Sequence, residues 1–397
     1  MTDAPRSFVV FADDWGGHPS CVQHVFRRLA LSHPTLWVNT VGLRPPRLDR
    51  RDAARVVRKV RTMLGGRARD NAGAAPREAT PDAGLKLQVC APPMVPWMRP
   101  EPVRALNRLA VHRALRRAAA HLGPGEPVLV AAVPNGVDAL GALPFAAVVY
   151  YCVDDFANWP GVDASAAERL ERELLAASDV VLATSEHLCQ TRISPKGPTL
   201  PLPHGVDVEH FSRASDPVTT PLDGVRRGRP VLGYLGLVDE RQDVALLVAV
   251  AEARPDWDLV FVGPTDKAPD PRLRRDNVRF VPAVPYARVP EALAGFDVAI
   301  LPYVRGEVTR AINPLKLREY LASGRPIVAT SLKEVARYHP RVRIADTPED
   351  FQREVQAALE GPRDLRAERE ALVREESWEA RARAFLSATE DAVGRRR

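Results

Sequence analysis

The chain has 397 residues, of which 45% are hydrophobic and 37 are proline, and this favours two or three globular domains with many turns between their elements. No apolar run is long enough for a transmembrane helix, and no signal-peptide core follows the N-terminus. The four cysteines are too widely spaced to indicate a zinc cluster or a disulfide framework, so we expect a cytoplasmic protein, with contact to the inner face of the membrane left open.

The positive charge is concentrated in the first third of the chain. Residues 1–120 carry 21 Lys and Arg against 9 Asp and Glu, although the net charge of the whole chain is only +6. Such a segment fits an acidic or phosphorylated partner, and it fits equally well a set of solvated, arginine-rich helix faces. Because no nucleic-acid-binding module is recognisable, nucleic acid is not predicted as a partner.

Short apolar strands alternate with helices in the first half. The predicted strands cover residues 8–11, 35–40, 85–89, 127–133, 146–153 and the start of 179–185, and the predicted helices cover residues 21–31, 50–64, 100–122 and 166–178. This alternation predicts a parallel sheet with helices packed on it. The helices at 50–64 and 100–122 are rich in arginine, so each either docks on the sheet as an ordinary surface helix or lies on an anionic membrane surface.

Polar side chains gather after two of these strands. They are Asp13, Asp14, Trp15 and His18 after the first strand, and Asp154 and Asp155 after the strand at 146–153. Ligands of open parallel sheets bind at the carboxyl ends of strands, so these residues are candidates for a site. The first loop lacks the G-x-G-x-x-G pattern of dinucleotide-binding folds, and the same carboxylates could simply cap their loops.

A second series of strands and helices follows residues 212–230, which are rich in Ser, Thr, Pro and Gly and indicate a linker. The predicted strands cover residues 230–236, 259–262, 278–281, 297–302, 327–329 and 342–344, and the predicted helices cover 243–253, 289–294, 314–323, 348–359 and 365–393. We therefore predict an α/β protein with two Rossmann-like, doubly wound domains, at residues 1–211 and 231–375. The C-terminal segment 376–397 is predicted to pack back toward the first domain.

The helix that starts near Pro314 has an unusual first turn. Lys316 lies there, where a cation opposes the helix dipole unless an anion is bound. The free N–H groups of a helix N-terminus suit a phosphate, and Glu319 is near enough to reach the sugar hydroxyls of the same nucleotide. A helix with a solvated Lys and Glu explains these residues equally well.

Five short motifs occur in a characteristic order along residues 180–395. They read PHGVD at 203–207, GYLG at 233–236, VGP at 262–264, DVAILP at 297–302 and EYLASGRP at 319–326. In order and spacing the chain resembles group 1 (family 4-like) glycosyltransferases of the glycosyltransferase B fold, although its first half agrees in layout more than in motif. The resemblance implies two Rossmann-like domains facing across a cleft.

The resemblance also implies an activity. It points to a nucleotide-sugar-dependent transferase of hexosyltransferase type that moves a sugar, with retention of configuration, to a glycan, a lipid-linked glycan or a similar acceptor in bacterial polysaccharide or glycoconjugate biosynthesis. The donor domain would be the C-terminal one and the acceptor domain the N-terminal one. A UDP- or GDP-sugar is the expected donor, with no metal and no other cofactor.

Donor-binding residues are implied by matching the family motifs position by position. The set is Gly236, Arg241, Gly263, Val284, Asn313, Pro314, Leu315, Lys316 and Glu319. Glu319 would bind the ribose hydroxyls, and Lys316 with the nearby N–H groups would bind phosphate or sugar. Gly236 would lie beside the phosphates, and Gly263 with Val284 near the base.

The chain departs from the family pattern at two places. Ala311 stands where the family's Glu-x7-Glu motif has its first glutamate, so Glu307 or Asn313 would have to replace that sugar contact. The usual basic residues after the first strand of the second domain are out of register, and Arg241 is the nearest cation. These departures leave open a non-catalytic nucleotide-sugar- or glycan-binding partner of another transferase, and a sugar-nucleotide epimerase of the same fold is a further alternative.

Catalytic and acceptor-side candidates come from both domains. The catalytic candidates are His18, Asp154 and Lys316, and the acceptor-side candidates are Asp14, Trp15, His18 and Asp155. A retaining transfer of this type needs no dedicated side-chain base. If the reaction inverts configuration, Asp13, His18 or Asp154 would have to act as the base.

Overall fold

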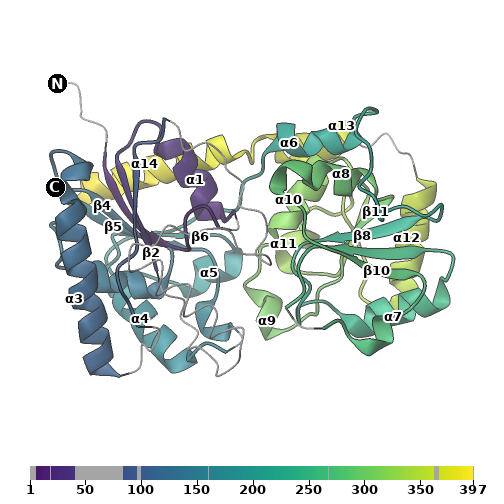
Figure 1. Ribbon diagram of the computed structural model, residues 1–397, viewed down its shortest axis with the longest axis horizontal. Coiled ribbons are helices and arrows are strands. Elements are labelled where there is room, and N and C mark those ends of the chain that lie inside the picture. Colours follow the sequence, from purple (N-terminus) through teal and green to yellow (C-terminus); the bar gives the residue numbers. More distant parts are fainter. Residues whose placement is uncertain are drawn as a thin grey trace. The chain divides into compact units, whose positions relative to one another are not determined.

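The computed structural model describes residues 6–17, 19–40, 84–95, 100–159, 161–266, 268–361 and 366–396. The chain divides into two compact units (Figure 1). Among the described residues, unit 1 comprises those up to Pro203 together with residues 381–396, and unit 2 is His204–Ala380. The helix predicted over residues 50–64 lies outside the described residues.

Among its described residues, unit 1 holds a sheet of seven parallel strands in the order β3-β2-β1-β4-β5-β6-β7. The strands are β1 Phe8–Ala12, β2 Thr35–Asn39, β3 Leu87–Cys90, β4 Val128–Ala131, β5 Ala147–Cys152, β6 Val180–Ala183 and β7 Thr199–Pro201. Every residue of β1, β4, β5 and β6 is buried, which explains why these strands read as continuous apolar runs and not as alternating patterns.

The helices of unit 1 connect and cover these strands. They are α1 Cys21–Leu29, α3 Glu101–Ala118, α4 Ala164–Ala177 and α5 Glu186–Thr191, with 3-10 turns η1 Ala119–Leu122, η2 Pro134–Ala139 and η3 Phe156–Asn158. The last helix, α14 (Trp378–Arg396), contributes the fully buried Phe385 to this core. Its ring lies 5.4 Å from Phe26 and 5.7 Å from Tyr151, so the end of the chain is part of unit 1.

Unit 2 contains, within its described residues, a six-stranded parallel sheet in the order β10-β9-β8-β11-β12-β13. The strands are β8 Val231–Leu235, β9 Asp258–Val262, β10 Val278–Val281, β11 Val298–Leu301, β12 Ile327–Ala329 and β13 Arg343–Ile344. The helices are α6 Val208–Ser212, α7 Val244–Ala253, α8 Val289–Ala294, α9 Glu307–Arg310, α10 Leu315–Ala322, α11 Lys333–Ala336, α12 Pro348–Glu360 and α13 Arg366–Arg374, with 3-10 turns η4 Arg213–Ser215, η5 Pro271–Leu273 and η6 Tyr286–Arg288. Two parallel sheets with intervening helices confirm the predicted α/β class.

The prediction of one helix over residues 365–393 is wrong, because α13 ends at Arg374 and α14 begins at Trp378. The break between them is held by long-range contacts of Glu376. Its backbone carbonyl accepts a hydrogen bond from the N–H of Val206 (2.9 Å), and its carboxylate pairs with Arg318 (2.5 Å). Partners so far away in sequence cannot be read from local periodicity. The predicted start of the helix at residue 314 is also wrong, because Pro314 is the N-cap of α10 and the helix begins at Leu315.

Candidate functional site

Two glycine loops meet at the carboxyl end of the sheet of unit 2. Gly236 follows β8 and has φ +126°, and Gly263 follows β9 and has φ +145°, a region that favours glycine. The N–H of Gly236 donates to the carbonyl of Val262 (2.8 Å), and a Cβ added to Gly263 would lie 2.3 Å from the carbonyl oxygen of Gly236. No larger residue fits at Gly263 without moving the neighbouring loop.

The side chain of Lys316 lies directly over the first of these loops. A Cβ added to Gly236 would be 1.9 Å from Cε of Lys316 and 2.7 Å from its Nζ. Lys316 belongs to the first turn of α10, so one place combines a helix N-terminus, an ammonium group and backbone that glycine leaves accessible. This combination is suited to binding an anion, and phosphate in particular.

The carboxylate of Glu319 lies on the same helix, within one turn of Lys316. Glu319 is partly exposed and makes no hydrogen bond to the described residues. Burial raises the pKa of its carboxyl group, and the nearby Lys316 opposes the shift. A carboxylate with free acceptor positions is what hydrogen bonding to a pair of sugar hydroxyls requires.

Helix α10 is held in register by buried polar contacts. The phenol oxygen of Tyr320 accepts a hydrogen bond from the N–H of Leu235 at the end of β8 (2.7 Å). The fully buried guanidinium of Arg318 pairs with Glu376 (2.5 Å) and donates to Oδ1 of Asn313 (2.7 Å). These contacts fix where the first turn of α10 stands relative to the two glycine loops.

The other predicted donor-side residues have different surroundings. The guanidinium of Arg241 pairs with Asp239 at 2.7 Å; burial opposes its charge, but hydrogen bonds to Asp239 raise the pKa of Arg241. Asn313 is 5% exposed and its Oδ1 is engaged by Arg318. Val284 is half-buried against the hydrophobic core, and Leu315 is the first residue of α10.

The position that departs from the family motif is enclosed. Ala311 is 5% exposed, and Glu307 pairs with Arg310 in the short helix α9. The structure therefore brings Gly236, Gly263 and Lys316 together, with Glu319 on the same helix.

The loop after β1 in unit 1 is tightly bonded. The carboxylate of Asp13 accepts hydrogen bonds from Oγ of Ser20 (2.9 Å) and Nε2 of Gln23 (2.7 Å). Asp13 is exposed at the surface of this loop, but partial desolvation of its carboxyl group raises its pKa to about 6. Asp14 is exposed, and its carbonyl accepts from the N–H of Gly17 (3.0 Å).

The remaining candidates on this loop differ in what they contact. The ring of Trp15 packs edge-on against Trp37 (centroids 4.7 Å apart), and the guanidinium of Arg27 lies 4.7 Å from its centre. Trp15 therefore helps to hold the loop. His18 lies outside the described residues.

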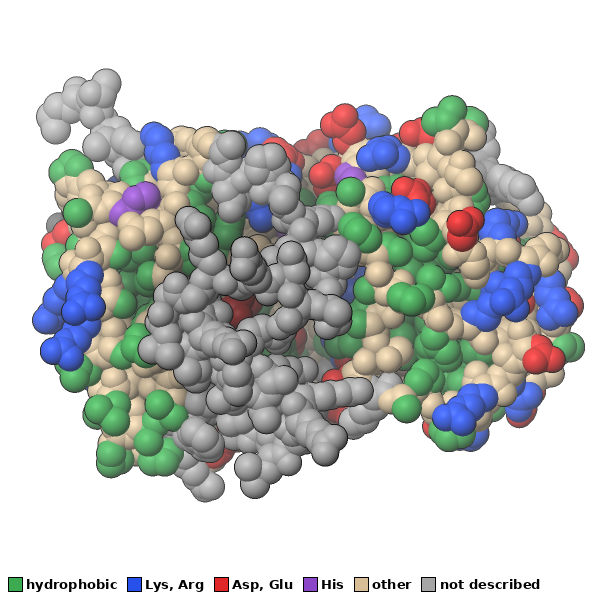
Figure 2. All heavy atoms as spheres, viewed as in Figure 1, with side chains coloured by type: hydrophobic (Ala, Val, Ile, Leu, Met, Phe, Trp, Pro, Cys, Tyr) green, Lys and Arg blue, Asp and Glu red, His purple; other side chains and the backbone are tan. Residues whose placement is uncertain are grey.

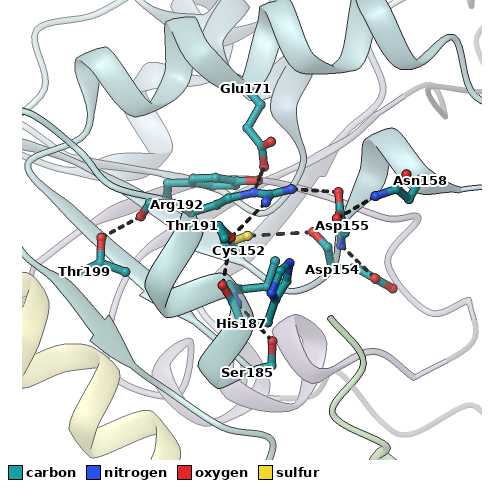
Figure 3. Close-up of polar contacts among 12 residues, drawn as sticks. Cys152, Asp154, Asp155, Asn158, Glu171, Ser185, His187, Thr191, Arg192 and Thr199 are labelled. Atoms are coloured by element: carbon teal, nitrogen blue, oxygen red, sulfur yellow. Dashed lines mark hydrogen bonds and ion pairs between the residues drawn. The ribbon is translucent and has the colours of Figure 1, made fainter. Parts of the chain in front are cut away.

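The carboxylates after β5 belong to a network that also includes Glu171 of α4 and Arg192 at the end of α5 (Figure 3). Asp155 is 8% exposed and pairs with Arg192 (2.7 Å). Arg192 also contacts Glu171 (3.2 Å), which accepts a hydrogen bond from the phenol of Tyr150 (2.6 Å). Asp155 is thus engaged in a structural ion pair.

Asp154 differs from its neighbour in exposure. It is partly exposed, and its Oδ1 accepts a hydrogen bond from the N–H of Asp155 (2.8 Å). Arg192 was not predicted from the sequence, because it lies 37 residues from Asp155 and carries no local signal. In contrast, the pairing of Arg241 with Asp239, two residues away, could have been found by local charge matching.

Comparison with known proteins shows which family this chain resembles. Residues 229–361 match the family model described as glycosyl transferases group 1. TuaH of Bacillus subtilis (strain 168), provisionally named a teichuronic acid biosynthesis glycosyltransferase, is 28% identical over 198 residues, which cover 47% of this chain and 49% of TuaH. The match thus spans about half of that relative's length. The resemblance to group 1 glycosyltransferases is confirmed.

Solved structures of the glycosyltransferase B fold match both units. Anabaena Alr3699/HepE in complex with UDP-glucose has a TM-score of 0.65 at 10% identity, covering 97% of this chain and 99% of that one. Sucrose-phosphate synthase from Thermosynechococcus elongatus has a TM-score of 0.64 at 15% identity, covering 97% and 98%. At this identity the likeness shows the fold, and the predicted glycosyltransferase B fold is confirmed.

The match to the group 1 family covers the part of unit 2 that is suited to binding an anion. Its residues Gly236, Gly263, Lys316 and Glu319 all fall within residues 229–361. In the described part of the chain, no group of three or more His, Cys, Asp or Glu side chains is placed to hold a metal ion. None of the described helices is both long and apolar enough to cross a bilayer.

Proposed function

We propose that this chain transfers a sugar from a nucleoside diphosphate donor to a glycan, lipid-linked or similar acceptor, and that unit 2 binds the donor. The observation that carries the proposal is the position of Lys316. This residue belongs to the first turn of α10, and its side chain lies over Gly236, which is next to Gly263. The proposal rests on this geometry together with the group 1 family match over residues 229–361.

The donor's charge and its sugar hydroxyls call for different groups. Negative charge grows on the departing nucleoside diphosphate, and Lys316 with the N-terminus of α10 would stabilise it. Glu319 would accept hydrogen bonds from the ribose hydroxyls. Since Arg241 already pairs with Asp239, we assign it a supporting part in neutralising the phosphates.

The chemical step exchanges one glycosidic bond for another. The bond between the sugar and the diphosphate oxygen breaks, and the acceptor oxygen forms the new bond. If configuration is retained, no side-chain base is required, because the acceptor's proton can pass to the departing phosphate oxygen. We propose that configuration is retained and that unit 1 holds the acceptor. Asp154 is the partly exposed carboxylate of unit 1 that we place beside the acceptor.

A UDP-sugar is the first donor to test, with a GDP-sugar second. The likeness in fold to the Anabaena structure, which was solved with UDP-glucose, makes UDP the natural starting probe. A ligand that binds only the native state raises stability by about 2.7 kcal/mol at a hundredfold excess over its dissociation constant, which is readily seen as a rise in Tm.

The test is a thermal-shift screen of the whole chain against UDP, GDP, ADP, TDP and CMP. We expect one nucleoside diphosphate to raise Tm, and Lys316→Gln and Glu319→Gln to abolish most of the shift. Lys333→Gln and Glu349→Gln are matched controls, since these exposed residues lie in the first turns of α11 and α12 of the same unit. No shift with any nucleotide, or equal shifts in all variants, would refute the donor assignment.

A non-catalytic nucleotide-sugar-binding partner is the second candidate, and the enclosed Ala311 favours it. The family motif places a carboxylate where this chain has a methyl group, and Asn313 is already bonded to Arg318. Nucleotide binding without donor hydrolysis or transfer would support this candidate. Product analysis would also separate a transferase, which releases the nucleotide, from a sugar-nucleotide epimerase, which does not release it as a product.

A further inference from the structure

Helix α3 of unit 1 exposes a stripe of two leucines and two arginines. Leu106 is 62% exposed and Leu109 is 52% exposed, and Arg113 and Arg117 are also exposed. With 3.6 residues per turn, these four positions lie within roughly 80° of the helix circumference and extend over about 16 Å of its length. Figure 2 shows Lys or Arg side chains beside hydrophobic ones at the left edge of the view, where Figure 1 places α3.

The opposite face of α3 accounts for its packing in unit 1. Its buried residues are Asn107, Val111, Leu115 and Ala118. Three further arginines anchor the sides of the helix: Arg104 pairs with Asp138 (3.0 Å), Arg108 donates to the carbonyl of Leu140 (3.3 Å), and Arg116 donates to the carbonyl of Ala142 (3.2 Å). The fold of unit 1 therefore uses every arginine of α3 except the two on the exposed stripe.

Arg113 and Arg117 make no hydrogen bond or ion pair with the described residues. The sequence from 102 to 120 contains five arginines and no acidic residue, so no neighbour on the helix offsets their charge. A single exposed leucine is ordinary on a protein surface. Two exposed leucines in line with two unpaired cations call for a partner that is anionic at its surface and apolar just below it.

We propose that Leu106, Leu109, Arg113 and Arg117 form a docking surface for an anionic lipid bilayer. The helix would lie along the surface, with the leucines entering the boundary between headgroups and acyl chains and the arginines contacting lipid phosphates. This surface belongs to unit 1 and does not include any donor-binding residue. It bears on the proposed function only by favouring a lipid-linked acceptor over a soluble one.

The experiment is flotation of the full chain with vesicles of phosphatidylcholine and phosphatidylglycerol in equal amounts, and with vesicles of phosphatidylcholine alone. We expect binding to the anionic vesicles, weakened by salt. Each arginine near an anionic surface contributes about fivefold in affinity, so Arg113→Gln with Arg117→Gln should weaken binding about 25-fold. Leu106→Ser with Leu109→Ser should weaken it several-fold and leave its salt dependence in place.

Matched controls change the same chemistry elsewhere on unit 1. Arg172→Gln with Arg383→Gln removes two exposed arginines, and Leu31→Ser with Ile193→Ser removes two apolar residues that are 59% and 60% exposed. Both controls should bind like the native chain. Equal binding by all variants, or no binding by the native chain, would overturn the proposal.

Two further readouts separate the possible failures. The nucleotide thermal shift should be the same in the native chain and in the α3 variants, so a failure of vesicle binding would leave the donor assignment untouched, and the reverse also holds. Binding to duplex DNA that is lost in the arginine variant, without any vesicle binding, would assign the stripe to nucleic acid and refute the lipid proposal.

Discussion

The backbone N–H of Leu235 donates a hydrogen bond of 2.7 Å to the phenol oxygen of Tyr320. Leu235 is the last residue of β8 and precedes Gly236, while Tyr320 follows Glu319 in α10. The ring of Tyr320 is fully buried, so water cannot replace this contact. The hydrogen bond therefore sets the distance between the glycine loop and the residues proposed to bind the donor.

Tyr320→Phe should lower stability and weaken nucleotide binding together. The substitution keeps the ring but leaves the buried N–H of Leu235 without an acceptor, which costs about 1–3 kcal/mol. We expect a lower midpoint of urea unfolding and a smaller Tm shift with UDP or whichever nucleotide binds. An unchanged unfolding midpoint would show that another acceptor or a water molecule can satisfy this N–H.

Gly236→Ala should remove donor binding at a moderate cost in stability. The new Cβ would lie 1.9 Å from Cε of Lys316, so the lysine would have to leave the loop, and φ +126° is strained for alanine. Gly224→Ala is the control, because Gly224 has φ +81° in the same unit and nothing within 4 Å of an added Cβ. The free energy of unfolding should fall by about 1–2 kcal/mol in both variants, but only Gly236→Ala should lose the rise in Tm caused by the nucleotide. An equal loss of that rise in both variants would contradict the role of Lys316.

Much of this fold could be predicted from the sequence because its signals are local. Fully buried parallel strands such as β4, β5 and β11 are continuous apolar runs, and the alternation with helices predicted two parallel sheets. Short helices such as α9 and α11 have too few residues to show a periodicity. The break between α13 and α14 was missed because Val206 and Arg318, the partners of Glu376, are far away in sequence.

Gly236 and Gly263 were predicted as donor-side residues because they match the family motifs, and the topology of the sheet explains why they lie together. Carboxyl ends of neighbouring parallel strands share one edge of a sheet, which brought Gly236 and Gly263 together and placed α10 beside them. The engagement of Asp155 by Arg192 was not predictable, because an ion pair between distant elements leaves no pattern along the chain. Exposure was equally hidden: the sequence showed a basic helix at α3, but only the structure shows which of its residues face solvent.

Glu376→Ala should be among the most destabilising single substitutions in unit 2. It leaves the fully buried guanidinium of Arg318 without its carboxylate, and removing one partner of a buried ion pair costs about 3–5 kcal/mol. Asn313, which Arg318 also contacts, would lose its fixed position just before α10, so nucleotide binding should weaken as well. Urea unfolding of the whole chain measures the first effect, and the nucleotide thermal shift measures the second.

Glu354→Ala provides the comparison for that experiment. Glu354 pairs with Arg343 at 2.9 Å, with side chains 23% and 37% exposed, and exposed pairs of this kind contribute about 1 kcal/mol or less. If Glu376→Ala lowers the free energy of unfolding no more than Glu354→Ala does, then Arg318 finds another partner or water. In that case the network around α10 does not position the site.

Asp13 should titrate near neutral pH and make the stability of unit 1 pH-dependent. Burial raises its pKa from 3.8 to about 6, so the folded state binds this proton more tightly than the unfolded state. The resulting stabilisation is complete below a pH of about 3.8 and is lost as the pH rises through about 6. The carbon-13 chemical shift of the Asp13 carboxyl carbon should therefore change with pH about a midpoint near 6. This signal is assigned by its absence in Asp13→Asn. Over the same pH range the native chain should lose stability relative to Asp13→Asn.

Asp256→Asn should show the opposite and smaller trend in stability, because the hydrogen bond from Arg254 lowers the pKa of Asp256 and the stabilisation from Asp256 is lost as the pH falls. A midpoint for Asp13 at the value of a free aspartate would show that solvent reaches its carboxylate freely, and would remove it as a candidate base at neutral pH.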